Sequence, residues 1–188
     1  VLLMNTREKL IIAAINVIEK DGMDGFTMRR VAAVCGVSCA APYKHFASKE
    51  ELFSAVLDYV DKRWEEEQSR AAEKYEGDLQ KQLIAVSMAY IRFITDNPHF
   101  RAVNFMRDER ASDAQRLNRA QMNSFSRELV SKWCMKAGYT HEQSVRKTYM
   151  VRAMIFGAIM MFESGELEYT QENMDMVEKS ITREFALD

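Results

Sequence analysis

Apolar residues recur every three or four positions along most of this chain, and glycines and short polar segments interrupt the pattern. That spacing predicts a series of amphipathic helices. The first helix is expected within residues 5–22, where Asp21-Gly22 supplies a stop. Its apolar stripe consists of Leu10, Ile11, Ala14, Ile15 and Ile18. One face of this helix should therefore lie in a core.

A short second helix is predicted between Thr27 and Gly36. Thr27 is a suitable N-cap because its hydroxyl can accept a hydrogen bond from a free backbone N–H group of the first turn. Gly36 suits the other end, because a glycine adopts the left-handed conformation that terminates a helix. Val31 and Val34 are expected to face inward.

A long helix is predicted to start at Ser48, since Ser48 and Glu51 have the spacing of a capping box. The charged stretch 62–78 is expected to be a solvated helix face with a break near Gly77. Further helices are predicted at 79–96, 99–106, 117–137, 142–164 and 171–186. With one more helix between Gly36 and Ser48, the expected fold is all-α with about nine helices.

The helix predicted at 142–164 is apolar on almost every side in its second half. A helix without a polar face must be covered all round. Together with the striped helix at 171–186, it is the expected contact surface between two copies of the chain. The residues predicted for this dimer interface are Ile155, Ile159, Phe162, Val177 and Ile181.

The composition agrees with a helical protein. Apolar residues make up 47% of the 188 positions, and two prolines and seven glycines leave room for long helices. Charge is unevenly distributed: residues 1–50 carry seven basic and five acidic side chains, whereas residues 51–188 carry 19 and 23. A mildly basic N-terminal part on an acidic body is compatible with DNA contact through one end.

The three cysteines, Cys35, Cys39 and Cys134, provide neither an even set for disulfides nor a paired metal-ligand spacing. No fourth ligand lies near Cys35, Cys39 and His45, so neither a metal nor another cofactor is expected. No charged-then-apolar leader is visible, and the longest apolar run, 153–162, has about half the length that a bilayer requires. A cytoplasmic location without a membrane partner is the expectation.

Residues 36–46, GVSCAAPYKHF, have the features of a helix-turn-helix. In this motif a tight glycine turn joins two short helices, and the second helix enters the DNA major groove. Ser38 is the expected cap of that second helix, and Pro42 is expected in its first turn or just past it. The small residues at 39–41 would allow close approach to DNA.

The longer run FTMRRVAAVCGVSCAAPYKHFASKEELF, residues 26–53, resembles the N-terminal module of TetR-type transcriptional repressors. It shows that family's order of Thr, an apolar pair, Gly-Val-Ser, Tyr-x-His-Phe and Lys-Glu-x-Leu. The resemblance covers about residues 8–60. It implies a DNA-binding domain in 1–50 and a helical effector-binding and dimerisation domain in 51–188. It also implies a homodimer that binds a pseudo-palindromic DNA operator.

Carried over by position, the resemblance implies DNA contacts from two short segments and Lys49. These residues are Thr27, Arg29, Ser38, Cys39, Ala40, Ala41, Tyr43, Lys44, His45 and Lys49. Phe46 would belong to the core. Cys39 and Pro42 depart from common members of the family. Because residues 39–41 read few base edges, recognition would rest on Arg29, Lys44 and contacts with thymine methyl groups. Cys39 is either a small residue that permits close approach or a redox sensor beside DNA.

The resemblance further implies that a small molecule binds among the middle helices. Methionines and aromatic residues are frequent there, and such side chains form either ordinary core or an adaptable apolar pocket. The candidates for the effector pocket are Met88, Phe93, Asn104, Phe105, Met122, Phe125, Trp133, Tyr149 and Met150. His99 and Arg107 join Asn104 as candidate polar groups, with surface placement as the alternative.

The sequence offers no catalytic motif: a zinc-binding HExxH, a phosphate-binding glycine loop and a nucleophile elbow are all missing. The function expected from the chain is therefore that of a one-component transcriptional repressor and not of an enzyme. Two alternatives stay open, namely a helical adaptor that binds protein partners and an enzyme whose site is built from scattered residues.

Overall fold

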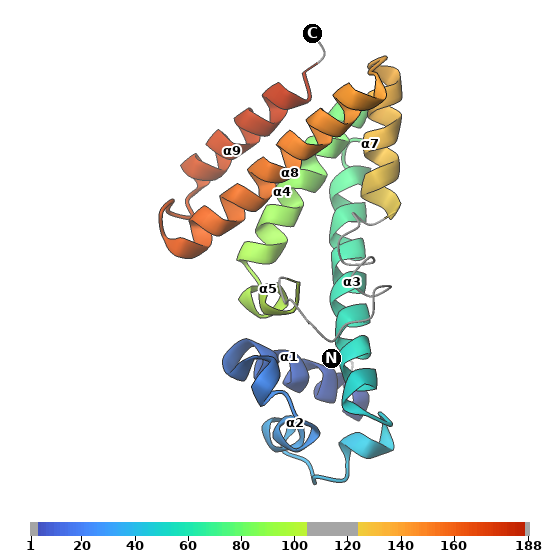
Figure 1. Ribbon diagram of the computed structural model, residues 1–188, viewed down its shortest axis with the longest axis vertical. Coiled ribbons are helices and arrows are strands. Elements are labelled where there is room, and N and C mark those ends of the chain that lie inside the picture. The colour runs from blue at the N-terminus through green and yellow to red at the C-terminus, as the bar shows by residue number, and fades with distance from the viewer. Residues whose placement is uncertain (1–3, 105–123, 187–188) are drawn as a thin grey trace. The chain divides into compact units, whose positions relative to one another are not determined.

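The computed structural model describes residues 4–104 and 124–186. Within these ranges the chain forms eight α-helices, one short 3-10 helix and no strand, which confirms the all-α prediction (Figure 1). Their bounds are α1 Thr6–Gly25, α2 Met28–Cys35, η1 Pro42–Lys44, α3 Lys49–Glu73, α4 Leu79–Thr95, α5 Pro98–Asn104, α7 Ser124–Lys136, α8 His141–Ser164 and α9 Gln171–Glu184.

The helices divide between two compact units. Unit 1 comprises the described residues of 1–64 and 97–108, and unit 2 comprises those of 65–96 and 109–188. Helix α3 contributes its first part to unit 1 and its last part to unit 2. The predicted DNA-binding domain in 1–50 and effector-binding domain in 51–188 are defined by function, whereas the two units are defined by packing. The functional boundary at residue 50 therefore stays a prediction.

Unit 1 is built around α1, which buries the whole stripe predicted for it. The backbone of α1 leaves helical geometry at Gly22, where φ is 66°, at the stop that the sequence predicts. Helix α5 packs against α1 and buries Phe100 and Val103. Phe26 adds a fully buried ring whose centroid lies 6.0 Å from that of Phe53 on α3.

One residue predicted to face inward lies at the surface. Val31 is fully buried, whereas 44% of Val34 is exposed. Helix α2 buries Met28, Val31 and Ala32, which are three and four residues apart and share one face. Val34 lies outside that face. In a helix of only eight residues, the spacing of apolar residues does not determine which of them face the core.

Unit 2 is organised by α4, which packs against α7, α8 and α9. Helices α8 and α9 run antiparallel beside each other (Figure 1). Thr140 and Thr170 cap their N-termini, each hydroxyl accepting from the backbone N–H three residues on. Near the other end of α9, Lys147 Nζ donates to the carbonyl oxygen of Glu184 at 2.8 Å. None of the described helices combines the length and the apolar character that crossing a membrane requires.

Candidate nucleic-acid interface

Helix α2 begins and ends as the sequence predicts. At its start, the backbone N–H of Arg30 donates to Thr27 Oγ1 at 3.2 Å. At its end, Gly36 has a φ of 71°, and the N–H of Val37 donates to the carbonyl of Ala32 at 3.0 Å. These bonds form a helix C-cap of the Schellman type, in which Gly36 adopts the left-handed conformation. The cap directs the chain out of α2 and into residues 38–46, here called the recognition segment.

Gly36→Ala is expected to destabilise unit 1 by about 1 kcal/mol, because a Cβ disfavours positive φ even though it would meet no atom within 4 Å. Gly36→Asn, which tolerates the left-handed region better, should lose less. Urea unfolding monitored by circular dichroism measures both changes. Equal stability of Gly36→Ala and the parent chain would contradict the geometry of this turn.

The recognition segment consists of overlapping tight turns rather than a continuous α-helix. The N–H of Ala41 donates to the carbonyl of Ser38 at 2.9 Å, and the N–H of Phe46 donates to that of Pro42 at 2.9 Å. Only Pro42–Lys44 is regular, as the 3-10 helix η1, and it has no side-chain cap. The helix predicted from Ser38 is thus shorter than expected. Pro42 lacks the N–H that an α-helix would bond to the carbonyl of Ser38.

Two buried residues hold the recognition segment in place. Phe46 is 1% exposed and Pro42 is also buried, and their spacing of four residues puts both on the inner side. Tyr43, which is 61% exposed, lies between them with the exposed Lys44 and His45. Burial of the two anchors therefore presents three neighbouring polar side chains to the outside.

The start of α3 fixes the end of this segment. The N–H of Glu51 donates to Ser48 Oγ at 3.2 Å, as predicted for a capping box. The carboxylate of Glu51 accepts from the N–H of Ala47 at 2.6 Å, one residue before the partner that a capping box has. Hydrogen bonds from its own backbone N–H and from the Ser48 hydroxyl hold the pKa of Glu50 below its usual range. Glu50 therefore stays charged at neutral pH.

All ten predicted DNA contacts lie in unit 1. Eight of them are exposed, whereas Ala41 and Lys49 are half-buried. Lys49 is turned inward: its Nζ lies 3.5 Å from the carbonyl oxygen of Met23 and 5.3 Å from the centroid of the Phe26 ring. The DNA contacts stay predictions, and the structure brings together an exposed set on α2 and the recognition segment.

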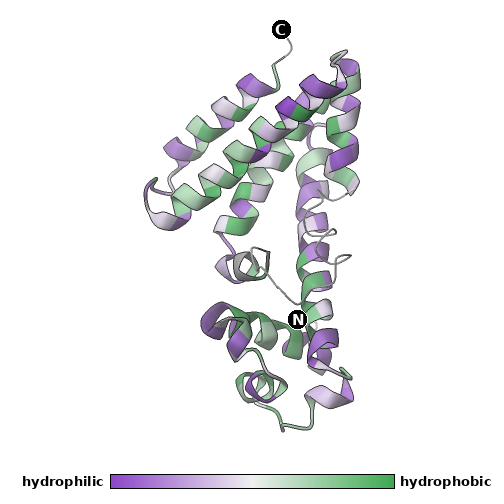
Figure 2. Ribbon diagram, in the orientation of Figure 1, coloured by the Kyte–Doolittle hydropathy of each residue, from purple (hydrophilic) through white to green (hydrophobic). Residues whose placement is uncertain are grey.

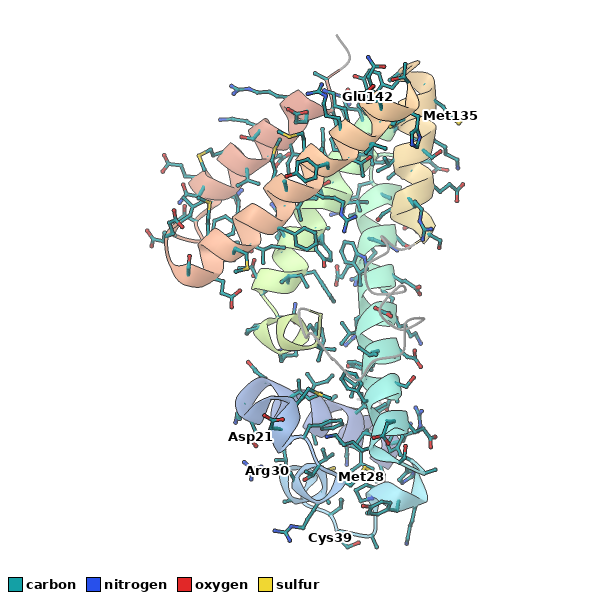
Figure 3. All side chains as sticks on the ribbon, in the orientation of Figure 1. Asp21, Met28, Arg30, Cys39, Met135 and Glu142 are labelled. Atoms are coloured by element: carbon teal, nitrogen blue, oxygen red, sulfur yellow. The ribbon has the colours of Figure 1, made fainter. Side chains whose placement is uncertain are left out.

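The basic side chains of unit 1 differ in their surroundings. Arg30 Nε pairs with Asp21 Oδ2 at 2.8 Å, and Figure 3 shows this pair apart from Cys39, which lies on the turn between α2 and η1. Arg29 and Lys44, by contrast, make no ion pair with any acidic residue in 4–104 or 124–186. Their charges are therefore free to meet phosphates or guanine acceptors.

Arg7 is an exposed basic residue beside the recognition segment that the sequence pattern does not indicate. Its guanidinium carbon lies 5.0 Å from the centroid of the Phe46 ring, while the side chain itself stays exposed. Helical spacing predicts neighbours within one helix, and Arg7 and Phe46 meet only through the tertiary packing of unit 1.

Residues 10–56 match the family model of bacterial regulatory proteins of the tetR family. A TetR family transcription regulator from Marinobacter aquaeolei VT8 has a similar fold, with a TM-score of 0.77 and 17% identity over 95% of this chain and 94% of that one. Residues 10–56 therefore form a TetR-type N-terminal domain, and the chain shares the fold of solved TetR family regulators. The family match spans α1, α2, the recognition segment and the start of α3.

Two other proteins show how much of the chain is similar in fold and how much in sequence. A protein with unknown function from Rhodococcus sp. RHA1 has a TM-score of 0.74 and 22% identity, covering 98% of this chain and 95% of that one. The nucleoid occlusion factor SlmA of Yersinia enterocolitica is 36% identical over 58 residues, which are 30% of this chain and 29% of SlmA. The match thus spans less than a third of the length of the curated relatives.

The residues predicted for an effector pocket are divided between the two units. Met88, Phe93 and Trp133 are buried in unit 2, and Phe125 and Met150 are half-buried there. Tyr149 is 68% exposed. Asn104 and the half-buried His99 both lie on α5, which belongs to unit 1. Phe105, Arg107 and Met122 lie outside the described residues.

The residues predicted for the dimer interface lie on α8 and α9. Ile159, Phe162, Val177 and Ile181 are buried within the chain itself, and Ile155 is half-buried. Contact of these residues with a second copy stays a prediction. A different set of large apolar side chains on the two helices is exposed: Val145, Tyr149, Met160, Met161 and Met176.

Proposed function

We propose that this protein is a regulator of the TetR family, a cytoplasmic repressor that binds a pseudo-palindromic DNA operator as a homodimer and is released by a small, largely apolar effector. It is not an enzyme and uses no cofactor. The observation that carries the proposal is the recognition segment, where Tyr43, Lys44 and His45 are held outward between two buried anchors. The two alternatives, an adaptor and an enzyme, give this segment no role.

The chemistry of the exposed residues suits DNA. The Tyr43 hydroxyl and the His45 ring donate hydrogen bonds to phosphate oxygens, and Lys44 neutralises a phosphate or reaches a guanine acceptor. Arg29 on α2 presents a planar guanidinium that fits the O6 and N7 atoms of guanine. The small side chains of Cys39 and Ala40, both exposed, permit close approach of the backbone. Because residues 39–41 read few base edges, base reading rests on Arg29, Lys44 and contacts with thymine methyl groups.

A selection of random duplex DNA bound by the purified protein tests this function. Two recognition segments related by a two-fold axis should select half-sites about 34 Å apart, one turn of DNA. The expected result is a pseudo-palindrome. Sequence-blind binding that falls steeply with salt would contradict the proposal.

The homodimer is supported by a second apolar stripe on α8, beside the one that unit 2 buries. One face buries Val151, Ile159 and Phe162 inside unit 2. The other exposes Val145, Tyr149 and Met160, which share a stripe at helical spacing. Figure 2 shows much of the second half of α8 coloured hydrophobic. A second copy of the chain would cover the exposed stripe, and an isologous contact of this kind matches a palindromic operator.

The effector is assigned to unit 2. Three side chains there have buried polar atoms without a partner within the described residues: Thr95 Oγ1, Trp133 Nε1 and Tyr139 Oη. Such groups are rare and call for water or a ligand. We infer that hydrogen-bonding groups of a largely apolar effector pair with one or more of these atoms. A coupling of about 1–3 kcal/mol between effector and DNA would lower operator occupancy about fivefold or more.

A further inference from the structure

Arg7 has three properties that set it apart among the basic residues of unit 1. It lies in the first turn of α1, it is exposed, and its guanidinium covers the ring of Phe46, the last residue of the recognition segment. The family match begins at residue 10 and so does not include it. Its contact nevertheless places a positive charge directly beside the segment that carries Tyr43, Lys44 and His45.

The charge of Arg7 is not neutralised within 4–104 or 124–186, where it pairs with no acidic side chain. Its neighbour Glu8 is engaged elsewhere: the carboxylate accepts from the backbone N–H of Asn5 at 3.2 Å as half of a capping box. Arg30 and Lys49 are different, because Arg30 pairs with Asp21 and Lys49 points toward the Met23 carbonyl. Arg7 therefore combines an available charge with a fixed position.

The chemistry of a stacked guanidinium favours one kind of ligand. Contact with an aromatic ring uses the flat face of the group and leaves its N–H edges free to donate. Those edges match a phosphate, which can accept two parallel hydrogen bonds. The buried Phe46 ring also limits the conformations of Arg7, so that less side-chain entropy is lost on binding.

We propose that Arg7 binds a DNA backbone phosphate beside the recognition segment, with Phe46 as the residue that positions its guanidinium. The inference rests on the proposed function. It adds a contact from α1 to those of α2 and the recognition segment, and this contact contributes affinity without reading sequence.

The test measures the affinity of Arg7→Gln for a selected duplex of about 30 base pairs, and for a scrambled duplex, at several salt concentrations. Loss of one phosphate contact should weaken binding to both duplexes about three- to tenfold and reduce the slope of log affinity against log salt by about one. Arg7→Lys should keep the wild-type slope. Lys20→Gln, which removes an exposed charge from the other end of α1, should change neither quantity.

Arg7→Met separates binding from folding, because its long apolar side chain still covers the Phe46 ring. The expected result is the reduced slope in Arg7→Met together with a wild-type melting temperature. A wild-type slope in either folded neutral variant overturns the assignment of Arg7 alone. A wild-type protein that binds no duplex would instead overturn the proposed function, and the role of Arg7 with it.

Discussion

Phe46→Ala is expected to destabilise unit 1 by about 3–5 kcal/mol, the usual cost of removing a fully buried ring. Phe46 is among the largest fully buried side chains of the described residues, and it anchors the recognition segment together with Pro42. Loss of the ring would leave a cavity and release the backbone that presents Tyr43 and Lys44. DNA binding should be lost along with stability. Urea unfolding monitored by circular dichroism measures the first effect, and a duplex titration measures the second.

His45→Ala is the matched control for stability. The two residues are adjacent, but His45 is exposed, so its truncation should change the free energy of unfolding by less than about 0.5 kcal/mol. A loss below about 1 kcal/mol in Phe46→Ala would contradict the packing described for this ring. It would mean that Pro42 and the turn bonds hold the segment without it.

Tyr149→Glu combined with Met160→Glu is expected to convert the proposed homodimer into a monomer. Both side chains are more than half exposed on the apolar stripe of α8 and neither contributes to the buried core, so unit 2 should stay folded. Placing charges between two apolar surfaces opposes their association. Because the two DNA-binding units of a dimer bind one operator together, the monomer should lose about 10²–10⁴-fold in operator affinity.

Sedimentation equilibrium measures the mass of each variant, and a duplex titration measures its affinity. Met135→Glu is the matched control, since Met135 is 78% exposed on α7 and lies outside the stripe. It should leave both quantities unchanged. A double variant that remains dimeric would show that another surface joins the copies. Charges at Ile159 or Ile181 are less informative, because both residues are already buried within the chain and their substitution would unfold it.

The helices of this chain could be predicted well because local chemistry defines their ends. Thr27, Thr140 and Thr170 are side-chain caps, and Gly36 and Gly138 adopt positive φ at helix ends. Each of these signals lies within a few residues of the element it ends. The predicted helices at 142–164 and 171–186 therefore agree closely with α8 and α9.

Three features could not be predicted because they depend on packing. The inward turn of Lys49 depends on the position of the Phe26 ring, and Arg7 meets Phe46 only in the folded unit. The sequence also could not tell which apolar residues of α8 the chain itself covers. Both Ile159 and Met160 are apolar residues of one helix, and only the packing of unit 2 buries the first and exposes the second.

The central claim is that α2 and the recognition segment read DNA sequence, and the most direct test is the specificity ratio of Arg29→Ala/Lys44→Ala. This ratio compares the affinity for the selected duplex with that for a scrambled duplex at one salt concentration. The parent protein should favour the selected duplex by about 10³-fold or more, and the variant should lose most of that preference while keeping its fold. An unchanged ratio in the folded variant would contradict the claim and place sequence reading elsewhere in the chain.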